Sequence, residues 1–154
     1  MNRFHFECRP EECLLGNLGI QNDIIEHHPG RGQVCKVLSE NSNLIGLIDE
    51  DPDANHHPYF KRLYKQAKPS KYGIICCDDK TNNNKLIILR PKFENWIIET
   101  ANRSNLSLSD FGLSGDPDKL HREINFNIGK LQSLIHQLKK VNNPAIKHLK
   151  SLIK

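Results

Sequence analysis

The chain has 154 residues, of which 37% are hydrophobic and 26% charged, and its formal net charge is +4. These values are typical of one globular domain and exclude a disordered or low-complexity chain. No apolar run approaches the roughly 20 residues of a membrane-spanning helix, and the charged first residues lack the apolar stretch of a signal peptide. We therefore predict a cytoplasmic protein with no membrane partner.

The first half of the chain alternates apolar segments of strand length with helical patterns. The predicted elements are a strand over 2–8, a helix opening at Pro10, a strand over 23–27, a helix over 33–40 and a strand over 44–48. The last of these segments is continuously apolar, which favours a central parallel strand buried on both faces. It ends at Asp49.

The second half begins with a helix over 58–67 and two strands, followed by further helices. The strands are expected over 72–77 and 85–89, joined as a hairpin by a polar turn, and the helices after Pro91, over 118–140 and over 144–153. The alternation predicts an α/β fold with a parallel-core sheet, helices on both faces and a C-terminal helical appendage. We assign residues 1–104 to the α/β part and expect helices in 105–154 to pack on the same domain.

Three carboxylates follow two of the predicted strands. Glu7 ends the first strand, Asp49 ends the third, and Asp51 comes two residues later. Because ligands bind beyond the carboxyl ends of parallel strands, we expect these side chains to converge within reach of one ion. Hard oxygen ligands suit Mg²⁺ or Mn²⁺, with substrate phosphates completing the coordination. The alternative is structural, because Asp49 or Asp53 would also serve as a helix cap.

The cysteines and histidines carry weaker signals. The five cysteines are an odd number without a Cys-x-x-Cys pair, so reduced and mostly buried thiols are favoured over a zinc site. Two histidine pairs, at 27–28 and 56–57, fall near predicted strand ends. They lie within possible reach of the acidic site, but we favour surface or loop positions for them.

The first third of the chain resembles a known family. The segments that carry the likeness are Phe4-His5-Phe6-Glu7, Ile24-Ile25-Glu26-His27, Gly30-Arg31-Gly32-Gln33-Val34 and Leu47-Ile48-Asp49-Glu50-Asp51. Their order and spacing are similar to the Toprim domain of topoisomerases, primases and overcoming-lysogenisation-defect nucleases. The resemblance implies a Toprim/Rossmann-like sheet and Mg²⁺-assisted phosphodiester chemistry. Glu7, Asp49 and Asp51 would be catalytic and would bind the metal together with Asp53.

A second segment, Arg90-Pro91-Lys92-Phe93-Glu94-Asn95-Trp96, looks like a motif of small Toprim-like nucleases from phage-defence systems. The resemblance implies that Glu94 supplies a further metal-binding carboxylate. Phe93 and Trp96 are more simply explained as core residues.

The basic residues and the missing motifs bear on the partners. Arg31, Lys80, Arg90 and Lys92 are candidates for contact with a nucleic-acid backbone, or else solvated surface charges. We predict a magnesium-dependent nuclease acting on DNA or RNA, as the effector of a phage-defence system. The alternative is a non-catalytic partner subunit of a separately encoded ATPase, since the chain has no phosphate-binding Gly-x4-Gly-Lys-Ser/Thr loop. Self-association is left open.

Overall fold

The computed structural model describes residues 3–21 and 24–153, and these residues contain one five-stranded sheet. The strands are β1 (Phe4–Phe6), β2 (Ile25–His27), β3 (Ile45–Asp49), β4 (Ile74–Asp79) and β5 (Asn84–Leu89), in the order β2-β1-β3-β5-β4. All neighbouring pairs are parallel except β4 with β5. The predicted α/β fold with a parallel core is therefore confirmed. Asn2 and Asp23, the first residues of two expected strands, lie outside the described residues.

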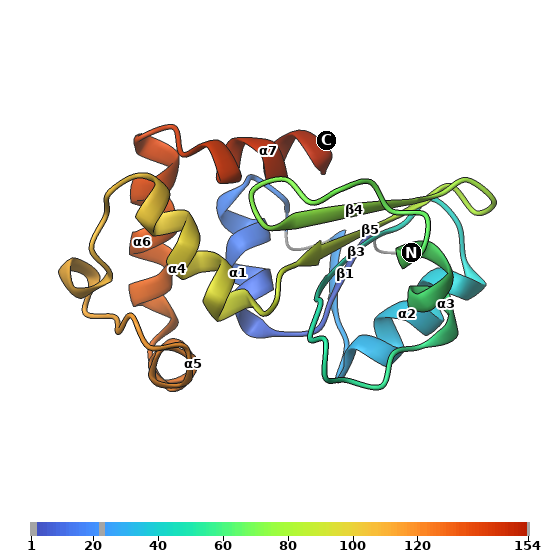
Figure 1. The fold of residues 1–154 in the computed structure, drawn as a ribbon, viewed down its shortest axis with the longest axis horizontal. Coiled ribbons are helices and arrows are strands. Elements are labelled where there is room, and N and C mark those ends of the chain that lie inside the picture. The colour runs from blue at the N-terminus through green and yellow to red at the C-terminus, as the bar shows by residue number, and fades with distance from the viewer. Residues whose placement is uncertain (1–2, 22–23, 154) are drawn as a thin grey trace.

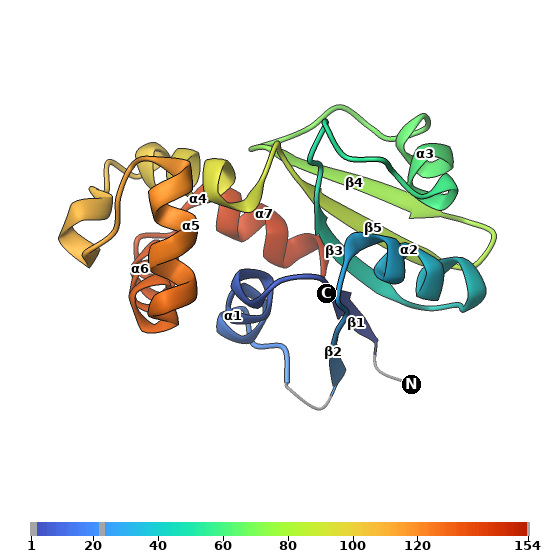
Figure 2. The same ribbon diagram turned by 90° about the horizontal axis from the view of Figure 1, so that it is seen from below.

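Helices cover both faces of the sheet, as the sequence predicts (Figures 1 and 2). They are α1 (Arg9–Asn17), α2 (Arg31–Glu40), α3 (Pro58–Tyr64), α4 (Phe93–Arg103), α5 (Pro117–Phe126), α6 (Ile128–Lys140) and α7 (Pro144–Leu152), with a 3-10 turn η2 (Leu108–Phe111). One apolar cluster packs α2 and α3 against one face, and a larger cluster packs α1 and α4–α7 against the other. No described helix is long and apolar enough to cross a membrane.

Strand β3 occupies the centre of the sheet because it is apolar on both sides. Gly46 allows α2 to approach it closely: a Cβ built on Gly46 would lie 3.0 Å from a methyl group of Leu38 and 3.2 Å from one of Val34. Ile48 is fully buried in the same layer. This close packing fixes the end of β3, where Asp49 lies, against the rest of the sheet.

The hairpin of β4 and β5 brings a distant segment beside β3. Leu89 is in register with Asp49, and the chain continues across the end of β3. There the amide of Glu50 donates to the carbonyl of Leu89 (2.9 Å) and the amide of Asp51 donates to that of Pro91 (2.8 Å). The residues that follow Pro91 therefore lie next to the carboxylates that follow β3.

The helix expected over 118–140 is two helices, which corrects that prediction. Asn127 has an extended backbone (φ −146°, ψ 90°), and its side chain accepts a hydrogen bond from the amide of Gly129 (3.1 Å). Asparagine and glycine are poor helix formers, and the cap gives the chain a stable alternative to continuing the helix. Apolar spacing alone hides this break because α5 and α6 bury their apolar residues in one cluster.

Asn143 ties the last helix to α4. It is fully buried, and its amide donates to the carbonyl of Thr100 and to Oγ of Ser104, both at 2.7 Å. Its side-chain oxygen accepts from the first amides of α7, those of Ala145 and Ile146. One side chain thus satisfies four polar groups at the junction of two helices.

Replacing Asn143 with Ala should destabilise the protein by about 2–4 kcal/mol, because α7 loses its cap and the buried Thr100 carbonyl loses its donor. Asn127→Ala, which removes an exposed cap of similar geometry, should cost only about 1 kcal/mol. Urea unfolding should be followed by circular dichroism and by the fluorescence of Trp96, the single tryptophan.

The two probes should give coincident transitions in both variants if residues 1–104 and 105–154 unfold as one unit. Equal losses for the two substitutions would contradict the role assigned to Asn143. Separate transitions would contradict the prediction of a single domain.

Candidate functional site

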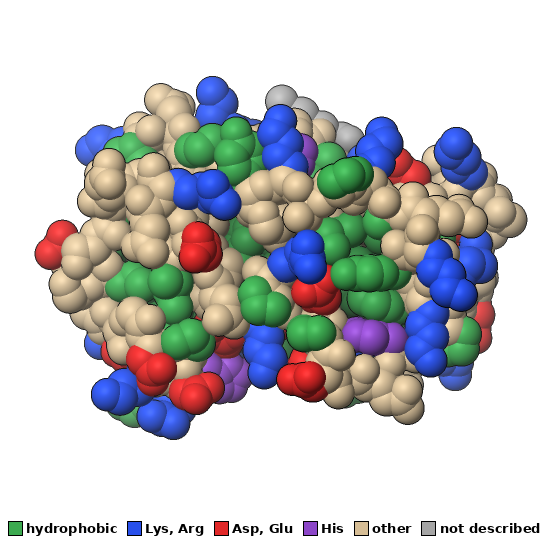
Figure 3. Space-filling view, in the orientation of Figure 1, with side chains coloured by type: hydrophobic (Ala, Val, Ile, Leu, Met, Phe, Trp, Pro, Cys, Tyr) green, Lys and Arg blue, Asp and Glu red, His purple; other side chains and the backbone are tan. Residues whose placement is uncertain are grey.

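A cavity of about 660 Å³ opens at the carboxyl ends of β1 and β3. The first turns of α1 and α4 and one side of α5 complete its walls. Its charged and titratable lining residues include Glu7, Asp49, Asp51, Glu94, Asp118, Arg9, Lys92, Arg122, His27 and His121. Acidic, basic and histidine side chains accordingly gather on the molecular surface between α5 and the sheet (Figure 3). The cavity is therefore a mixed-charge site at the sheet edge that the sequence singles out.

The structure brings together four of the five predicted metal ligands. Glu7, Asp49, Asp51 and Glu94 line the cavity, whereas Asp53 is exposed in the following turn and is not among the lining residues. Within the described residues, however, no three histidine, cysteine, aspartate or glutamate side chains at this cavity place their ligand atoms within 4.8 Å of one another. Glu7, Asp49 and Asp51 therefore share the cavity without forming a compact cluster, and their binding of one ion stays a prediction.

Arg31 explains much of this separation. It is the first residue of α2, and its guanidinium lies 2.9 Å from Oδ2 of Asp51 and 3.8 Å from Oε2 of Glu7. It also donates to the carbonyl of Asp49 at 3.3 Å. Its side chain is mostly buried, so solvent screens these contacts less than at the surface. Arg31 thus neutralises part of the acidic cluster and holds Asp51 toward α2.

Three carboxylate oxygens at the site lack a hydrogen-bond donor. Oε2 of Glu7, Oδ1 of Asp49 and Oε1 of Glu11 are buried and accept no hydrogen bond from an N–H or hydroxyl group within the described part of the chain, although Arg31 lies 3.8 Å from the Glu7 oxygen and the Glu11 and Asp49 carboxyls interact with each other. A buried acceptor without a donor costs roughly 1–3 kcal/mol, and a charged one costs more. Oxygens in this condition suit a cation, which would supply the missing favourable contact.

Glu11 is a site residue that sequence reasoning missed. It is fully buried, and its Oε2 accepts a hydrogen bond from the amide of Cys8 at 2.7 Å. An acid in the first turn of a helix is ordinarily explained by the helix dipole, and that explanation concealed its role. The signal available was the capping pattern, because a glutamate three residues after the helix cap turns back toward the preceding strand.

Glu11 and Asp49 are electrostatically linked. Burial raises the pKa of Glu11 well above its usual range, and the nearby Asp49 raises it further. Burial likewise raises the pKa of Asp49, while the amide of Phe93 and the Glu11 carboxyl favour its ionised form by hydrogen bonding. One proton is therefore retained between these two carboxyls more readily than in water.

A carboxylate–imidazole pair faces the same cavity. Nδ1 of His121 lies 2.6 Å from Oε1 of Glu94, and Nε2 of His121 lies 3.1 Å from the amide nitrogen of Asn125. Glu94 is buried and His121 is exposed, so the carboxylate orients an imidazole that solvent reaches. His121 was also missed, because it belongs to α5 and no local pattern links that helix to the sheet edge.

The four predicted nucleic-acid contacts occupy different places. Lys92 is exposed and lines the cavity, and Arg31 lies against its carboxylates. Arg90 instead pairs with Oε2 of Glu50 at 3.0 Å beside a neighbouring cavity. Lys80 lies in the β4–β5 turn, near the amino ends of β3 and β5 and therefore at the opposite end of these strands from the cavity. Two further cations that the sequence did not single out, Arg9 and Arg122, also line the cavity.

In metal-free protein, Glu11→Gln should raise the stability at pH 7–8. The folded state holds protons on raised carboxyls that the unfolded state has released, so the free energy of unfolding falls as pH rises above the unfolded pKa. Glutamine cannot ionise, yet its oxygen still accepts from Cys8. For a shift of one pKa unit the gain is about 1.4 kcal/mol, or roughly 3–6 °C in Tm.

The stability gained by Glu11→Gln over the wild type should become smaller as the pH is lowered toward 4, because Glu11 is then largely protonated in the unfolded state as well as in the folded state. The matched control is Glu12→Gln, which changes an exposed acid in the same turn of α1 and should show no such pH dependence. Tm measured with a chelator present would decide the matter. Parallel pH profiles for wild type and Glu11→Gln would contradict the buried-charge account.

Comparison of the chain with protein-family models, curated proteins and solved structures yields no match. The resemblance to Toprim nucleases consequently rests on the short motifs alone. The fold class rests on the strand order and helix packing described above. Function is therefore argued from the cavity and its residues.

Proposed function

We propose that the chain is a nuclease that hydrolyses phosphodiester bonds in DNA or RNA with the help of Mg²⁺ or Mn²⁺. The observation that carries the proposal is a pair of buried oxygens, Oε2 of Glu7 and Oδ1 of Asp49, that accept no hydrogen bond within the described residues and belong to carboxylates lining a cavity where Lys92 is exposed. Acidic oxygens beside cations are the arrangement that a metal-dependent enzyme acting on a phosphate backbone needs.

The residues present fit a hard divalent ion. Glu7 and Asp49 would hold it, with Asp51 available if Arg31 released its carboxylate. Mg²⁺ is commonly held by only one or two protein carboxylates together with substrate phosphates, so the lack of a compact three-carboxylate cage is compatible with it. When bound, the ion would neutralise the charge of the scissile phosphate.

The other side chains at the cavity have separate tasks in this proposal. Lys92, Arg9 and Arg122 attract and position the anionic backbone, which is where most of the affinity for nucleic acids arises. Glu94 orients His121, whose imidazole would exchange a proton with the attacking water or the leaving oxygen. Arg31 limits the repulsion between Glu7 and Asp51 before substrate binds.

One observation favours the alternative, a non-catalytic partner subunit of a separately encoded ATPase. Arg31 already supplies a positive charge to Asp51 and Glu7, so part of the acidic cluster is balanced without an ion. In that case the cavity would bind an anionic or basic surface of the partner protein and would not cleave a nucleic acid. A role as the effector of a phage-defence system belongs to the nuclease proposal and derives from the motif resemblance.

Asp49→Ala should lower metal-dependent cleavage by at least about 100-fold, because it removes a rigidly held ligand at the end of β3. The assay is cleavage of plasmid, single-stranded DNA and transfer RNA with Mg²⁺ or Mn²⁺. Circular dichroism and Tm should show a retained fold. Asp53→Ala is the matched control and should keep wild-type activity, because Asp53 is exposed outside the cavity.

An active and folded Asp49→Ala variant would place the cleavage centre elsewhere. A wild-type chain without activity on any of these substrates would favour the partner-subunit alternative.

Lys92→Ala should weaken binding of a short DNA or RNA about equally for different sequences and reduce the slope of log K against log salt by about 1. Lys80→Ala makes the same charge change at the other end of the strands, away from the cavity, and should leave the slope unchanged. Fluorescence anisotropy at several salt concentrations measures both. Equal effects of the two substitutions would mean that only the net charge of the chain attracts nucleic acid.

A further inference from the structure

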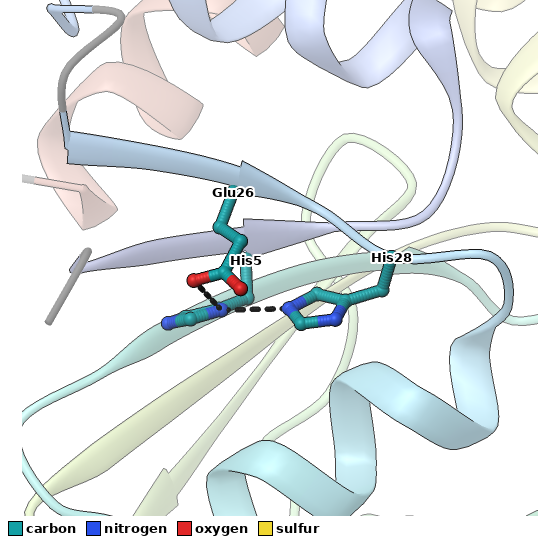
Figure 4. A group of neighbouring side chains, drawn as sticks. All are labelled: His5, Glu26 and His28. Carbon is teal, nitrogen blue, oxygen red and sulfur yellow. Dashed lines mark hydrogen bonds and ion pairs between the residues drawn. The ribbon is translucent and has the colours of Figure 1, made fainter.

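Two histidines and a glutamate meet on the face of the sheet that α2 covers, near the edge strand β2 (Figure 4). His5 lies in β1, Glu26 is its partner in the register of β2, and His28 follows β2 directly. The amide of His28 donates to the carbonyl of Phe6 at 2.9 Å, which holds it beside β1. Backbone pairing, more than flexible loop packing, therefore brings the three side chains together.

Their donor atoms are unusually close. Nδ1 of His5 lies 2.8 Å from Nε2 of His28 and 3.9 Å from Oε2 of Glu26. Among the residues that the structure describes, this is the one group of histidine, cysteine or acidic side chains with three ligand atoms within 4.8 Å of one another. The exposed fractions of the side chains of His5 and Glu26 are 1% and 46%, and His28 as a whole is 8% exposed.

We propose that His5, His28 and Glu26 bind Zn²⁺. Tetrahedral zinc with bonds of about 2.0–2.1 Å places its donor atoms roughly 3.3 Å apart. The ion would replace the hydrogen bond between His5 and His28, whose two nitrogens would separate by about half an ångström, and Glu26 would move toward His5 by a similar amount. Changes of this size need only small side-chain rotations, and the half-exposed Glu26 is free to make the larger one.

The donor chemistry distinguishes this site from the acidic cavity. Two imidazoles and one carboxylate suit zinc and similar transition metals, whereas Mg²⁺ prefers oxygen donors. Three protein ligands leave the fourth position for water or an exogenous ligand, reached from the exposed side of Glu26.

The site would act as a clamp on an exposed edge. β2 is a strand of three residues, and within the part of the chain that the structure describes it pairs with β1 alone. A two-stranded contact of that length is weak by itself. A metal ligated from both strands would stabilise the folded state because the unfolded chain does not present the three donors together.

The test is titration of the chain, without any histidine tag, with Zn²⁺ by calorimetry and with Co²⁺ as a spectroscopic probe. With excess Mg²⁺ present to occupy the acidic cavity, we expect one Zn²⁺ or Co²⁺ ion per chain, visible absorption typical of tetrahedral cobalt, and a rise in Tm on adding Zn²⁺. Loss of an outer partner of a zinc ligand typically weakens binding 10–100-fold, so Glu26→Gln and His28→Gln should each weaken Zn²⁺ binding by about 100-fold or more. Glu26→Gln is the decisive variant, since a half-exposed and nearly isosteric change leaves the fold intact.

Two control variants separate this site from other histidines and from the cavity. His136→Gln removes an exposed histidine of α6, and Asp49→Asn alters the acidic cavity; both should bind Zn²⁺ as the wild type does. The proposal is overturned if the wild type does not bind Zn²⁺ stoichiometrically. It is also overturned if each of the single variants Glu26→Gln and His28→Gln binds Zn²⁺ as tightly as the wild type. Loss of binding in Asp49→Asn alone would overturn it too, by assigning the ion to the cavity.

Discussion

The repulsion among carboxylates buried at one edge of the sheet is the constraint on which the site depends. Glu7 and Asp49 are held there because β1 and β3 run parallel and their carboxyl ends lie at the same side of the sheet, and Glu11 is held by the first turn of α1. Strand pairing and the first turn of α1 thus fix the backbones of all three residues close together. The apolar clusters on the two faces therefore stabilise an arrangement that is electrostatically unfavourable by itself, as is common where charge is needed for binding.

The negative charge of these carboxylates is only partly balanced, and the groups that balance it come from several elements of the fold. Arg31 arrives with the start of α2 and pairs with Asp51, while a retained proton lowers the charge of Glu11 and Asp49. The antiparallel hairpin carries Lys92 and Glu94 across the end of β3, and α5 adds His121. The C-terminal helices are thus part of the site's wall. A parallel core alone would leave the carboxylates open to solvent, where their repulsion would be screened and their ligand-binding value reduced.

The sequence could predict features that depend on a local pattern, but not those that depend on how distant segments pair in the sheet. Glu7 and Asp49 were predictable because strand ends are readable from apolar runs and parallel strands end at one edge. The Arg31 ion pair, the Glu94–His121 pair and the meeting of His5 with Glu26 depend on strand order and on which residues face each other across strands. Those relations are set by packing over many residues and leave no local pattern. The break at Asn127 is different: its cap was readable, but helical spacing on both sides concealed it.

The alternation of side chains along β1 and β2 gives the sheet two chemically different faces. His5 and Glu26 point toward the α2 side, while Phe6 and His27 pack against each other on the opposite side, with ring centroids 5.4 Å apart. His27 lines the acidic cavity, and it lies in the chain between Glu26 and His28. Any ligand that fixes β2 through Glu26 and His28 also fixes the backbone of His27. The imidazole cluster and the oxygen-rich cavity therefore share a strand of three residues, although their donor atoms suit different ions.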